Sequence, residues 1–438
     1  MRARRFISVL ALACLTALSC SKDGDFDIGS GGQGGSSSHS STREPIPAES
    51  FDKVFLMVSG GHNDISSYIT EDQRDMAGNW LPGGTREDKD IMVCLSRVMK
   101  SPGFTDVTVP VLYRMYRQAD GTVRRDTLHR WGPDDRLFEG SVIHDALEMV
   151  RRRFPARSYG MVISSHGTGW LPVRYYYNPT TFENNLQFAV RPRSIGQDDD
   201  GEVSVEISLP DFIAAIPYKL DYLLLDCCLC GGVEVAWGLR GKADLVGFSQ
   251  TEILADGFDY KKIVQRLLGG EKPDARAVCE DYFAQYYKPP EQYPYNGSAT
   301  ISLIDTREMD DLASVCAALF EKYRTQLAVL DGSEDDWAGW KIQGYFRFNR
   351  HYFYDLEDVL IKLGITEEEH AQLSAALERC VLYKAHTPWF MYGSWSGSGF
   401  PIKIHSGFSM YLPSMGTAFL NSYYKEYMSW NDATHLVL

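Results

Sequence analysis

The chain has 438 residues, of which 44% are apolar and 23% are charged, and this composition is typical of a folded globular protein. Its 44 Lys and Arg residues are outnumbered by 58 Asp and Glu residues, which gives a formal net charge of −14. Because a chain with this charge and no long basic run is poorly suited to bind phosphates, we expect no nucleic-acid partner. The only uninterrupted apolar stretch, residues 6–18, is too short for a membrane-spanning helix.

The first twenty residues have the pattern of an export signal. Three arginines among residues 2–5 precede the apolar stretch, and Ser19-Cys20 follows it directly. The segment resembles a bacterial lipoprotein signal, which implies that residues 1–19 are removed and that Cys20 carries a lipid anchoring the protein to a membrane. Residues 21–25 (SKDGD) resemble the signals that send Bacteroidetes lipoproteins to the cell surface. We therefore expect an exported lipoprotein of the outer membrane or cell surface, or alternatively of the periplasm. A plain secretory signal with an incidental Cys20 is the other interpretation.

Residues 20–50 are expected to be a flexible tether. They include the sequence GSGGQGGSSSHSST, whose Gly- and Ser-rich composition cannot bury a core. The fold is expected to begin near Phe51.

Beyond Phe51, short apolar runs alternate with segments of helical periodicity, a pattern typical of βαβ units around a mostly parallel sheet. The expected strands span residues 53–58, 106–113, 160–164, 221–225, 243–248 and 300–304. Helices are expected where apolar residues share one helical face, at Ile91, Cys94, Leu95 and Val98 and at Ile143, Leu147 and Val150. Ligand sites of such sheets form beyond the carboxyl ends of the strands.

Two of these strands end in residues that can perform chemistry. One leads into His166-Gly167, and the other leads into Asp226-Cys227-Cys228-Leu229-Cys230 before a helix-like stretch at residues 233–239. A thiol near a helix N-terminus gains a positive field, which favours the thiolate. A lone His is more often structural and a buried Cys is more often an inert apolar side chain, so the informative feature is the pair.

The order of a strand ending in His-Gly and a later strand ending in Cys resembles that of caspase-like cysteine peptidases. Residues 226–236 (DCCLCGGVEVA) resemble the nucleophile segment of the clostripain family in particular. Other segments similar to that family are residues 63–68, 193–199, 247–252, 256–258 and 407–413.

The resemblance covers roughly residues 51–413 and implies an α/β fold. The expected architecture is a caspase-like three-layer sandwich, a mostly parallel sheet covered by helices on both faces. We expect a peptidase core over residues 51–270 and a C-terminal α/β extension over residues 271–438 packed on this core.

The family register implies that Cys228 is the nucleophile. Cys227 then occupies a position where the family usually has Ala, and Cys230 one where it often has Met. Because side chains alternate along a strand end, Cys227 and Cys228 should face opposite sides, so only one of them can meet His166. We interpret Cys227 as a packed thiol in the Ala position, and Cys230 as filling the Met position.

A metal site is the competing interpretation of the three thiols. They lack the two well-separated Cys or His clusters of a tetrahedral zinc site, so we expect no metal there. A disulfide framework is also disfavoured in a chain of this length, because the other cysteines have no regular spacing: Cys94, Cys279, Cys316 and Cys380.

The expected chemistry is acyl transfer on a polypeptide substrate, with no cofactor required. The Cys228 thiolate attacks a peptide carbonyl, and His166 protonates the leaving amine and then activates the water that clears the thioester. By analogy with caspase-like sites, the backbone N–H groups of Gly167 and Cys228 are expected to stabilise the oxyanion.

The resemblance also implies cleavage after Arg or Lys. Asp226 corresponds to the family's acidic residue two positions before the nucleophile, and a carboxylate at the base of a pocket pairs with guanidinium or ammonium. Asp256 is a second candidate substrate-binding residue. In the alternative interpretation, Asp226 only hydrogen-bonds its own turn.

A charged stretch between the two catalytic candidates includes Arg193 and the run Asp198–Asp200. Some clostripain relatives are processed between their catalytic residues, which makes Arg193 a candidate for self-cleavage; a solvated surface loop is the alternative. Some clostripain relatives depend on calcium, and this resemblance makes the acidic run a candidate site for calcium as a structural or activating ion, although three consecutive acids lack the alternating ligand spacing of an EF-hand.

Two classes of function are consistent with the sequence. The first is an exported, membrane-tethered cysteine endopeptidase. The second is a lipoprotein that retains the peptidase fold but binds peptides or other ligands without turnover, an alternative suggested by the altered thiol neighbourhood.

Overall fold

The computed structural model describes residues 50–99, 109–172, 175, 179, 195–199, 204–287, 297–335, 339–346, 352–391 and 399–438. The expected signal segment, Cys20 and nearly all of the expected tether lie outside these residues, as does Arg193.

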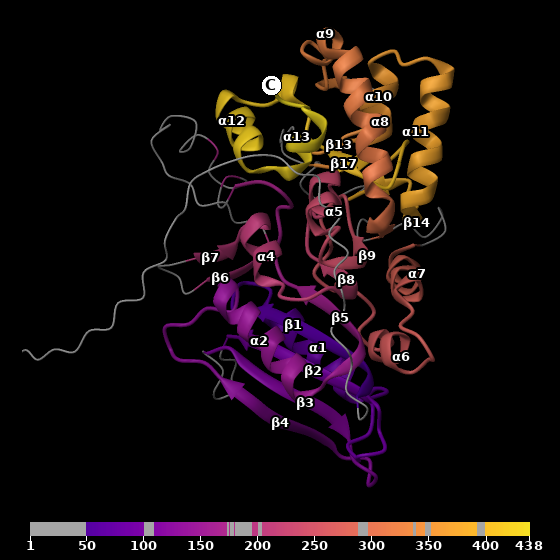
Figure 1. Ribbon diagram of the computed structural model, residues 1–438. Helices are drawn as coiled ribbons and strands as arrows, with labels where there is room; N and C mark the ends of the chain where they lie inside the picture. Colours follow the sequence, from indigo (N-terminus) through magenta and orange to yellow (C-terminus); the bar gives the residue numbers. More distant parts are fainter. Residues whose placement is uncertain are drawn as a thin grey trace, which may run out of the picture. The chain divides into compact units, whose positions relative to one another are not determined.

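A mixed sheet runs through the described fold, with the strand order β14-β10-β9-β8-β5-β1-β2-β3-β4 (Figure 1). Neighbours from β9 to β2 are parallel, whereas β10 and β14 on one side and β3 and β4 on the other are antiparallel to their neighbours. These strands are β1 (Phe51–Gly61), β2 (Asp90–Val98), β3 (Val111–Arg117), β4 (Val123–Arg130), β5 (Ala156–Ser164), β8 (Leu220–Asp226), β9 (Ala243–Phe248), β10 (Thr300–Asp305) and β14 (Val381–His386). The short strands are β6 (Ile195–Asp199), β7 (Ser204–Ile207), β11 (Glu334–Asp335), β12 (Gly339–Trp340), β13 (Tyr354–Asp355), β15 (Trp389–Phe390), β16 (Phe400–Pro401) and β17 (Ser409–Met410). The expected α/β fold with a mostly parallel central sheet is confirmed.

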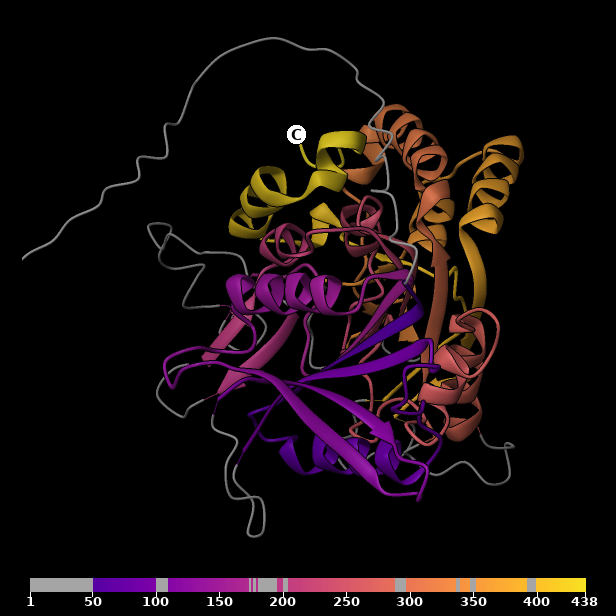
Figure 2. The same ribbon diagram turned by 60° about the horizontal axis from the view of Figure 1, so that its bottom comes forward.

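Helices cover both faces of the sheet because its central strands are apolar on both faces. In β1, Val54, Leu56 and Val58 belong to one apolar cluster and Phe55 and Met57 to the other, which is the alternation of a strand. Figure 2 shows α1 on one side of the sheet and α2 on the other.

Helices that pack in the cluster of Phe55 are α1 (Ser66–Gly78), α6 (Ile263–Leu268) and α7 (Ala275–Tyr286). The cluster of Val54 includes residues of α2 (Gly140–Arg153), α4 (Leu209–Ala215), α5 (Val233–Leu239), α8 (Met309–Lys322), α9 (Arg324–Leu327), α10 (Leu356–Lys362), α11 (Glu367–Cys380), α12 (Ala418–Tyr427) and α13 (Ser429–Thr434). No helix in these described ranges has both the length and the apolar character needed to cross a membrane.

The helix predicted at Ile91, Cys94, Leu95 and Val98 is wrong, because these residues form strand β2. All five residues from Ile91 to Leu95 are fully buried between β1 and β3. A continuous apolar run satisfies a helical stripe and a doubly covered strand equally well, so only the tertiary neighbours decide between them. By contrast, the helix predicted around Ile143 is confirmed as α2.

The strand predicted over residues 106–113 is only partly described. Strand β3 begins at Val111, and residues 100–108 lie outside the described ranges.

The C-terminal part of the chain contributes strands to the main sheet. Both β10 and β14 lie beyond residue 270, and β10 pairs directly with β9. Farther along, the backbone N–H of Ser409 donates to the carbonyl of Gly231 at 2.8 Å, and that of Tyr411 donates to the buried Glu234 carboxylate at 2.9 Å. Residues 271–438 therefore complete the sheet and also support the segment that follows Cys228.

A buried ion pair fastens the β6–β7 hairpin to the sheet. Arg97 in β2 and Asp198 in β6 are joined at 3.0 Å, and their side chains are 3% and 0% exposed. The same carboxylate accepts a hydrogen bond from the backbone N–H of Leu137 at 2.5 Å. Burial raises the pKa of Asp198, and the charge of Arg97 opposes this effect.

We predict that Arg97→Ala lowers the free energy of unfolding by about 3–5 kcal/mol, because it leaves the Asp198 carboxylate buried without its counter-ion. Denaturant unfolding monitored by circular dichroism provides the measurement. Arg74→Ala is the control, since Arg74 pairs with Glu71 on the surface and such pairs contribute about 1 kcal/mol or less. Equal losses in the two variants would contradict the prediction.

Candidate active site

The pairing of β5 with β8 determines where the two predicted catalytic residues lie. The strands are parallel, and Ser164 is opposite Asp226 in their register. His166 and Cys228 each follow these paired residues by two positions, so both leave the sheet at the same edge. A Cβ added to Gly167 would lie 2.8 Å from the Cβ of Cys227 and 3.0 Å from the carbonyl oxygen of Cys228. The His-Gly loop therefore packs directly on the thiol turn.

The His166 imidazole is paired with a carboxylate that the sequence analysis missed. Its Nε2 lies 2.6 Å from Oδ1 of Asp64, and the two side chains are 26% and 85% exposed. Asp64 follows β1, the strand beside β5, so it reaches the same edge of the sheet. The sequence signal by which Asp64 could have been found is its position just beyond the carboxyl end of a predicted strand. Between the described side chains of His166 and Cys228 there is no hydrogen bond.

The Cys228 thiol is half-buried and contacts the backbone of Ile253. Its sulfur accepts a hydrogen bond from the Ile253 N–H at 3.3 Å and lies 3.6 Å from the Ile253 carbonyl oxygen, to which the thiol can donate. Burial, and then the charge of Glu252, raise the pKa of this thiol well above its ordinary value. Helix α5, whose N-terminus was expected to favour the thiolate, begins five residues after Cys228, at Val233.

The turn after Cys228 is strained and tightly fixed. Leu229 has a φ of 60°, in the left-handed region that is uncommon for a residue with a side chain. Its buried backbone N–H donates to the carbonyl of Thr251 at 2.9 Å, and the N–H of Gly231 donates to that of Ser249 at 2.7 Å. Such strain persists only where the surroundings impose it, and it is concentrated at functional sites.

Cys227 and Cys230 are packed thiols. Both are at most 1% exposed and belong to the apolar core. A hydrogen bond with Cys230, together with burial, raises the pKa of Cys227 well above its ordinary value. The sulfur of Cys227 lies 3.8 Å from the Ile163 carbonyl, whereas that of Cys228 contacts Ile253, so the two side chains have different neighbours.

The backbone N–H groups of Gly167 and Cys228 lie on the two loops that meet at this edge. No hydrogen bond within the described ranges of the chain takes up either group.

Asp226 is buried at the end of β8, with 4% of its surface exposed. Its Oδ2 accepts hydrogen bonds from the hydroxyl of Tyr260 at 2.6 Å and from the backbone N–H of Phe258 at 3.1 Å, and Ser164 provides a further one. Burial raises the pKa of Asp226 to about 6, while these hydrogen bonds oppose the rise. These partners lie on the loop at residues 258–260 and on β5, not in the turn that follows Asp226.

The loop with Asp256, the second predicted substrate-binding residue, covers Asp226. Gly257 has a φ of +59°, and a Cβ there would lie 2.4 Å from Oδ2 of Asp226. Its carbonyl accepts hydrogen bonds from Gln285 at 2.6 Å and from Tyr286 at 3.1 Å. This fixed loop brings the exposed Asp256 close to Asp226.

A third carboxylate, Asp72 of α1, lies in the same region and was not selected from the sequence. It is 7% exposed and shares the buried face of α1 with Ile69 and Met76. Burial, and then the charges of Asp226 and three other carboxylates including Asp256, raise the pKa of Asp72 to about 9. The available signal was an acidic residue within an apolar stripe at helical spacing.

Comparison with known proteins decides the family. The model of the clostripain family matches residues 58–437. The chain belongs to the clostripain family. It is thus a cysteine peptidase by family and fold, in a family whose substrates are polypeptides, and the predicted family is confirmed.

Two solved structures have a similar fold. One is an inactive zymogen C11 protease from Parabacteroides distasonis, which is 25% identical, with 89% of this chain and 99% of that chain covered and a TM-score of 0.69. The other is a secreted C11 cysteine protease from Bacteroides thetaiotaomicron in complex with an irreversible peptide inhibitor, which is 23% identical, with 88% and 99% covered and a TM-score of 0.67. The chain matches none of the curated proteins compared with it.

Within the described part of this clostripain-family chain, no group of three or more His, Cys, Asp or Glu side chains is arranged to hold a metal ion. Of the acidic run suggested for calcium, Asp198 is paired with Arg97, and Asp200 lies outside the described residues. Calcium binding therefore stays a prediction. One of the three carboxylates proposed for it, that of Asp198, is already paired with Arg97.

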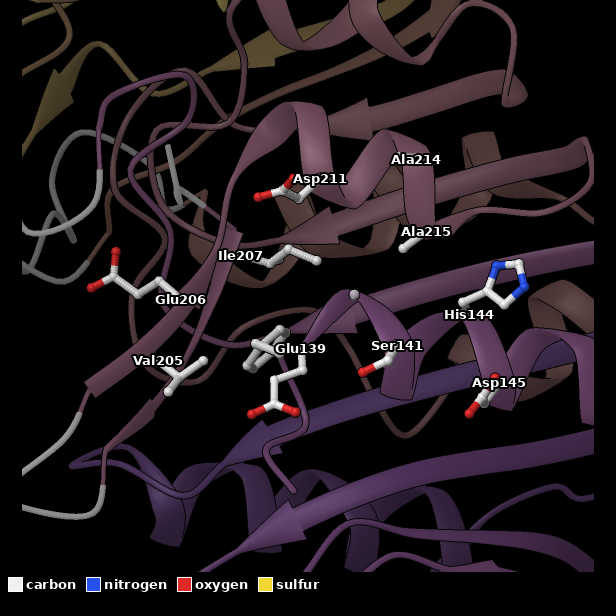
Figure 3. A pocket seen from close by; sticks show the side chains of 12 residues that line it. Glu139, Ser141, His144, Asp145, Val205, Glu206, Ile207, Asp211, Ala214 and Ala215 are labelled. Atoms are coloured by element: carbon white, nitrogen blue, oxygen red, sulfur yellow. The ribbon is translucent and has the colours of Figure 1, made fainter. Parts of the chain in front are cut away.

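A separate pocket of about 620 Å³ lies among α2, α4 and β7 (Figure 3). Its titratable lining residues are Glu139, His144, Asp145, Glu206 and Asp211. Neither His166 nor Cys228 lines it, so it is distinct from the predicted catalytic residues of the clostripain-family site.

We predict that Gly257→Ala lowers the free energy of unfolding by about 2–4 kcal/mol, because it combines left-handed strain with a collision against Asp226. Gly364→Ala is the matched control, since Gly364 has a φ of +85° but no atom within 4 Å of an added Cβ. The control should lose only about 1 kcal/mol. Urea unfolding of both variants gives the comparison, and equal losses would exclude a close approach of Gly257 to Asp226.

We predict that Asp72→Asn raises the free energy of unfolding, relative to wild type, more at pH 8 than at pH 5. The pKa of Asp72 in the folded protein, about 9, lies above its ordinary value of 3.8, so the folded state binds more protons and loses stability as the pH rises between these values. Asn removes this loss, about 4 kcal/mol between the two pH values. Asp52→Asn is the control, because Asp52 pairs with Arg157 on the surface at 3.5 Å and is not among the carboxylates that raise the pKa of Asp72. Thermal unfolding at both pH values tests the difference, and a gain independent of pH would contradict it.

Proposed function

We propose that this protein is an exported cysteine endopeptidase that cleaves polypeptides after Arg or Lys through Cys228 and His166. The observation that carries the proposal is the parallel pairing of β5 and β8, which brings the predicted base and the predicted nucleophile to one sheet edge on loops that touch. Membership of the clostripain family supports the same chemistry.

In the proposed reaction, the Cys228 sulfur attacks the carbonyl carbon of the scissile bond after its proton has passed to His166. The N–H groups of Gly167 and Cys228 stabilise the oxyanion, and the imidazolium gives its proton to the departing amine. Water, deprotonated by His166, then hydrolyses the thioester and regenerates the thiol. Asp64 orients the imidazole and stabilises its charged form.

The described arrangement is a resting one. The Cys228 thiol is engaged by Ile253 and His166 by Asp64, so the sulfur must leave Ile253 before it can donate its proton to the imidazole. Self-cleavage at Arg193 and calcium binding are the proposed routes of activation. Catalytic hydrogen bonds are often incomplete without substrate, so this geometry is compatible with turnover.

The same contacts favour a second candidate function, a peptide-binding lipoprotein without turnover. Alkylation of the folded protein below neutral pH discriminates between the two. Selective modification of Cys228 after self-processing would favour the peptidase, whereas reactivity no greater than that of the packed cysteines would favour the binding protein.

Export and anchoring remain part of the proposal. A solved relative from Bacteroides thetaiotaomicron is described as secreted, and the N-terminal pattern predicts lipidation at Cys20. Mass spectrometry of the mature N-terminus, with Cys20→Ala as the control, would show whether a lipid is attached.

We predict that Cys228→Ala and His166→Ala each lower turnover by about 10³-fold or more, while Cys227→Ala retains it within about tenfold. The measurement is the initial rate on reporter peptides that differ only in the residue before the cut, and Arg and Lys should be preferred. Loss of activity in Cys227→Ala together with retention of activity in Cys228→Ala would identify Cys227, and not Cys228, as the nucleophile. No cleavage of any peptide, with or without calcium and after self-processing, would favour the binding protein.

A further inference from the structure

The thiol turn is held from the side by residues 249–251, the β9 exit, where the chain leaves strand β9. The backbone N–H of Leu229 donates to the carbonyl of Thr251 at 2.9 Å, and that of Gly231 donates to the carbonyl of Ser249 at 2.7 Å. Both donors and both acceptors are backbone groups. The thiol turn therefore keeps its position only where the β9 exit keeps its own.

This support matters most at Leu229, which directly follows the predicted nucleophile. Its φ of 60° is sterically unfavourable, and a strained residue keeps its conformation only where its surroundings impose it. The N–H that Thr251 accepts belongs to the peptide group joining Cys228 to Leu229. Without this hydrogen bond, the backbone of Cys228 could rotate and carry the thiol away from the geometry of attack.

A side chain of the neighbouring strand β10 fixes the β9 exit. The Thr300 hydroxyl accepts hydrogen bonds from the backbone N–H of Gln250 at 3.0 Å and from that of Thr251 at 3.1 Å. It also lies 2.9 Å from the hydroxyl of Ser249 and 3.1 Å from that of Thr251, to one of which it can donate its own hydrogen. Because a hydroxyl has one hydrogen and two lone pairs, these three residues use its whole bonding capacity.

The position of Thr300 in a strand does not itself require a hydroxyl. Thr300 is fully buried, and a valine has nearly the same shape, suits a strand equally well and buries no polar atom. Without the hydroxyl, however, the buried N–H groups of Gln250 and Thr251 would lose the acceptor that the structure gives them, which native proteins rarely tolerate. The hydroxyl is therefore explained by the β9 exit and not by the sheet.

The side chain of Gln250 holds the same segment at a second point. Its Nε2 donates to the hydroxyl of Ser302 at 3.1 Å and to the carbonyl of Gly407 at 2.8 Å. Its Oε1 lies 2.7 Å from Nε2 of His405. Because these contacts do not involve Thr300, loss of the Thr300 hydroxyl should loosen the β9 exit without unfolding it.

We propose that Thr300 is a positioning residue, whose hydroxyl acts through the β9 exit to hold Cys228 in the geometry of attack. The inference rests on the proposed function and deepens it, because it adds a residue that touches neither the thiol nor the substrate. The Gly257 loop beside the predicted substrate-binding carboxylates is held separately, by Gln285 and Tyr286. Substrate binding should therefore depend little on Thr300.

The test measures kcat and KM on one arginine reporter peptide for wild type, Thr300→Val and Thr300→Ser. We expect Thr300→Val to lower kcat by about 10- to 100-fold, with KM within about threefold, because a displacement of about 1 Å is enough to slow a reaction about 100-fold. Thr300→Ser keeps the hydroxyl, so its kcat should stay within about threefold of wild type. If Thr300→Val does not fold, Thr300→Ala decides, since no added methyl group then faces the two N–H donors.

Thr306→Val is the matched control. Thr306 is buried at the opposite end of the β9–β10 pair, and its hydroxyl donates to the carbonyls of Ala243 and Asp244. The substitution removes a buried hydroxyl of the same kind and leaves the β9 exit untouched. A loss of activity caused only by lower stability would therefore appear in Thr306→Val as well.

Hydrogen exchange followed by mass spectrometry adds a direct measurement of the thiol turn. The amides of Leu229 and Gly231 should exchange about tenfold faster or more in Thr300→Val than in wild type, because their acceptors in the β9 exit are no longer fixed. Their exchange should change little in Thr300→Ser and in Thr306→Val.

The outcomes separate the two proposals. Lower kcat and faster exchange in Thr300→Val, absent from Thr300→Ser and Thr306→Val, support the inference. Unchanged kcat or unchanged exchange in Thr300→Val, an equal loss in Thr306→Val, or a loss that serine does not reverse overturns the role of Thr300 and leaves the proposed function intact. A wild-type protein that cleaves no peptide, even after self-processing, overturns the proposed function and the inference with it.

Discussion

The main-chain pairing of β5 with β8 is the constraint on which the site depends. Because Ser164 is opposite Asp226, the His-Gly loop and the thiol turn leave the sheet side by side. A slip of one residue would turn every side chain of the strand to the other face, and both faces here are buried. The cost of that slip fixes the register, and the register brings together residues that are distant in the sequence.

Burial at this edge has one electrostatic effect on several groups. It raises the pKa of Asp72, Asp226 and Cys228, since each loses water that would stabilise its charged form. For the thiol, the consequence is a neutral group engaged by the Ile253 backbone. For the carboxylates, it is that the protonated, uncharged form persists to a higher pH than in an exposed carboxyl.

The parts of this architecture that were predictable are those encoded locally. The strands that end before His166 and Cys228 were found because apolar runs stop at turn residues, and the family follows from the segment around Cys228. Strand β2 was mistaken for a helix because a continuous apolar run has no distinguishing period. Ile253 was missed because its contact with Cys228 comes from a neighbouring loop, which no sequence spacing encodes. Asp64 did have a sequence signal, its place beyond the carboxyl end of a predicted strand, but its pairing with His166 depends on the neighbouring strand.

Asp72 shows how a local signal can be present in the sequence and still need the structure to be interpreted. On the buried face of α1 it lies between Ile69 and Met76, where an apolar residue would pack without electrostatic cost. Periodicity alone shows only that an acidic residue interrupts an apolar stripe. The fold adds the burial that raises the pKa of this carboxyl to about 9, so its charged form is disfavoured in the folded protein and stability falls as the pH rises toward that value.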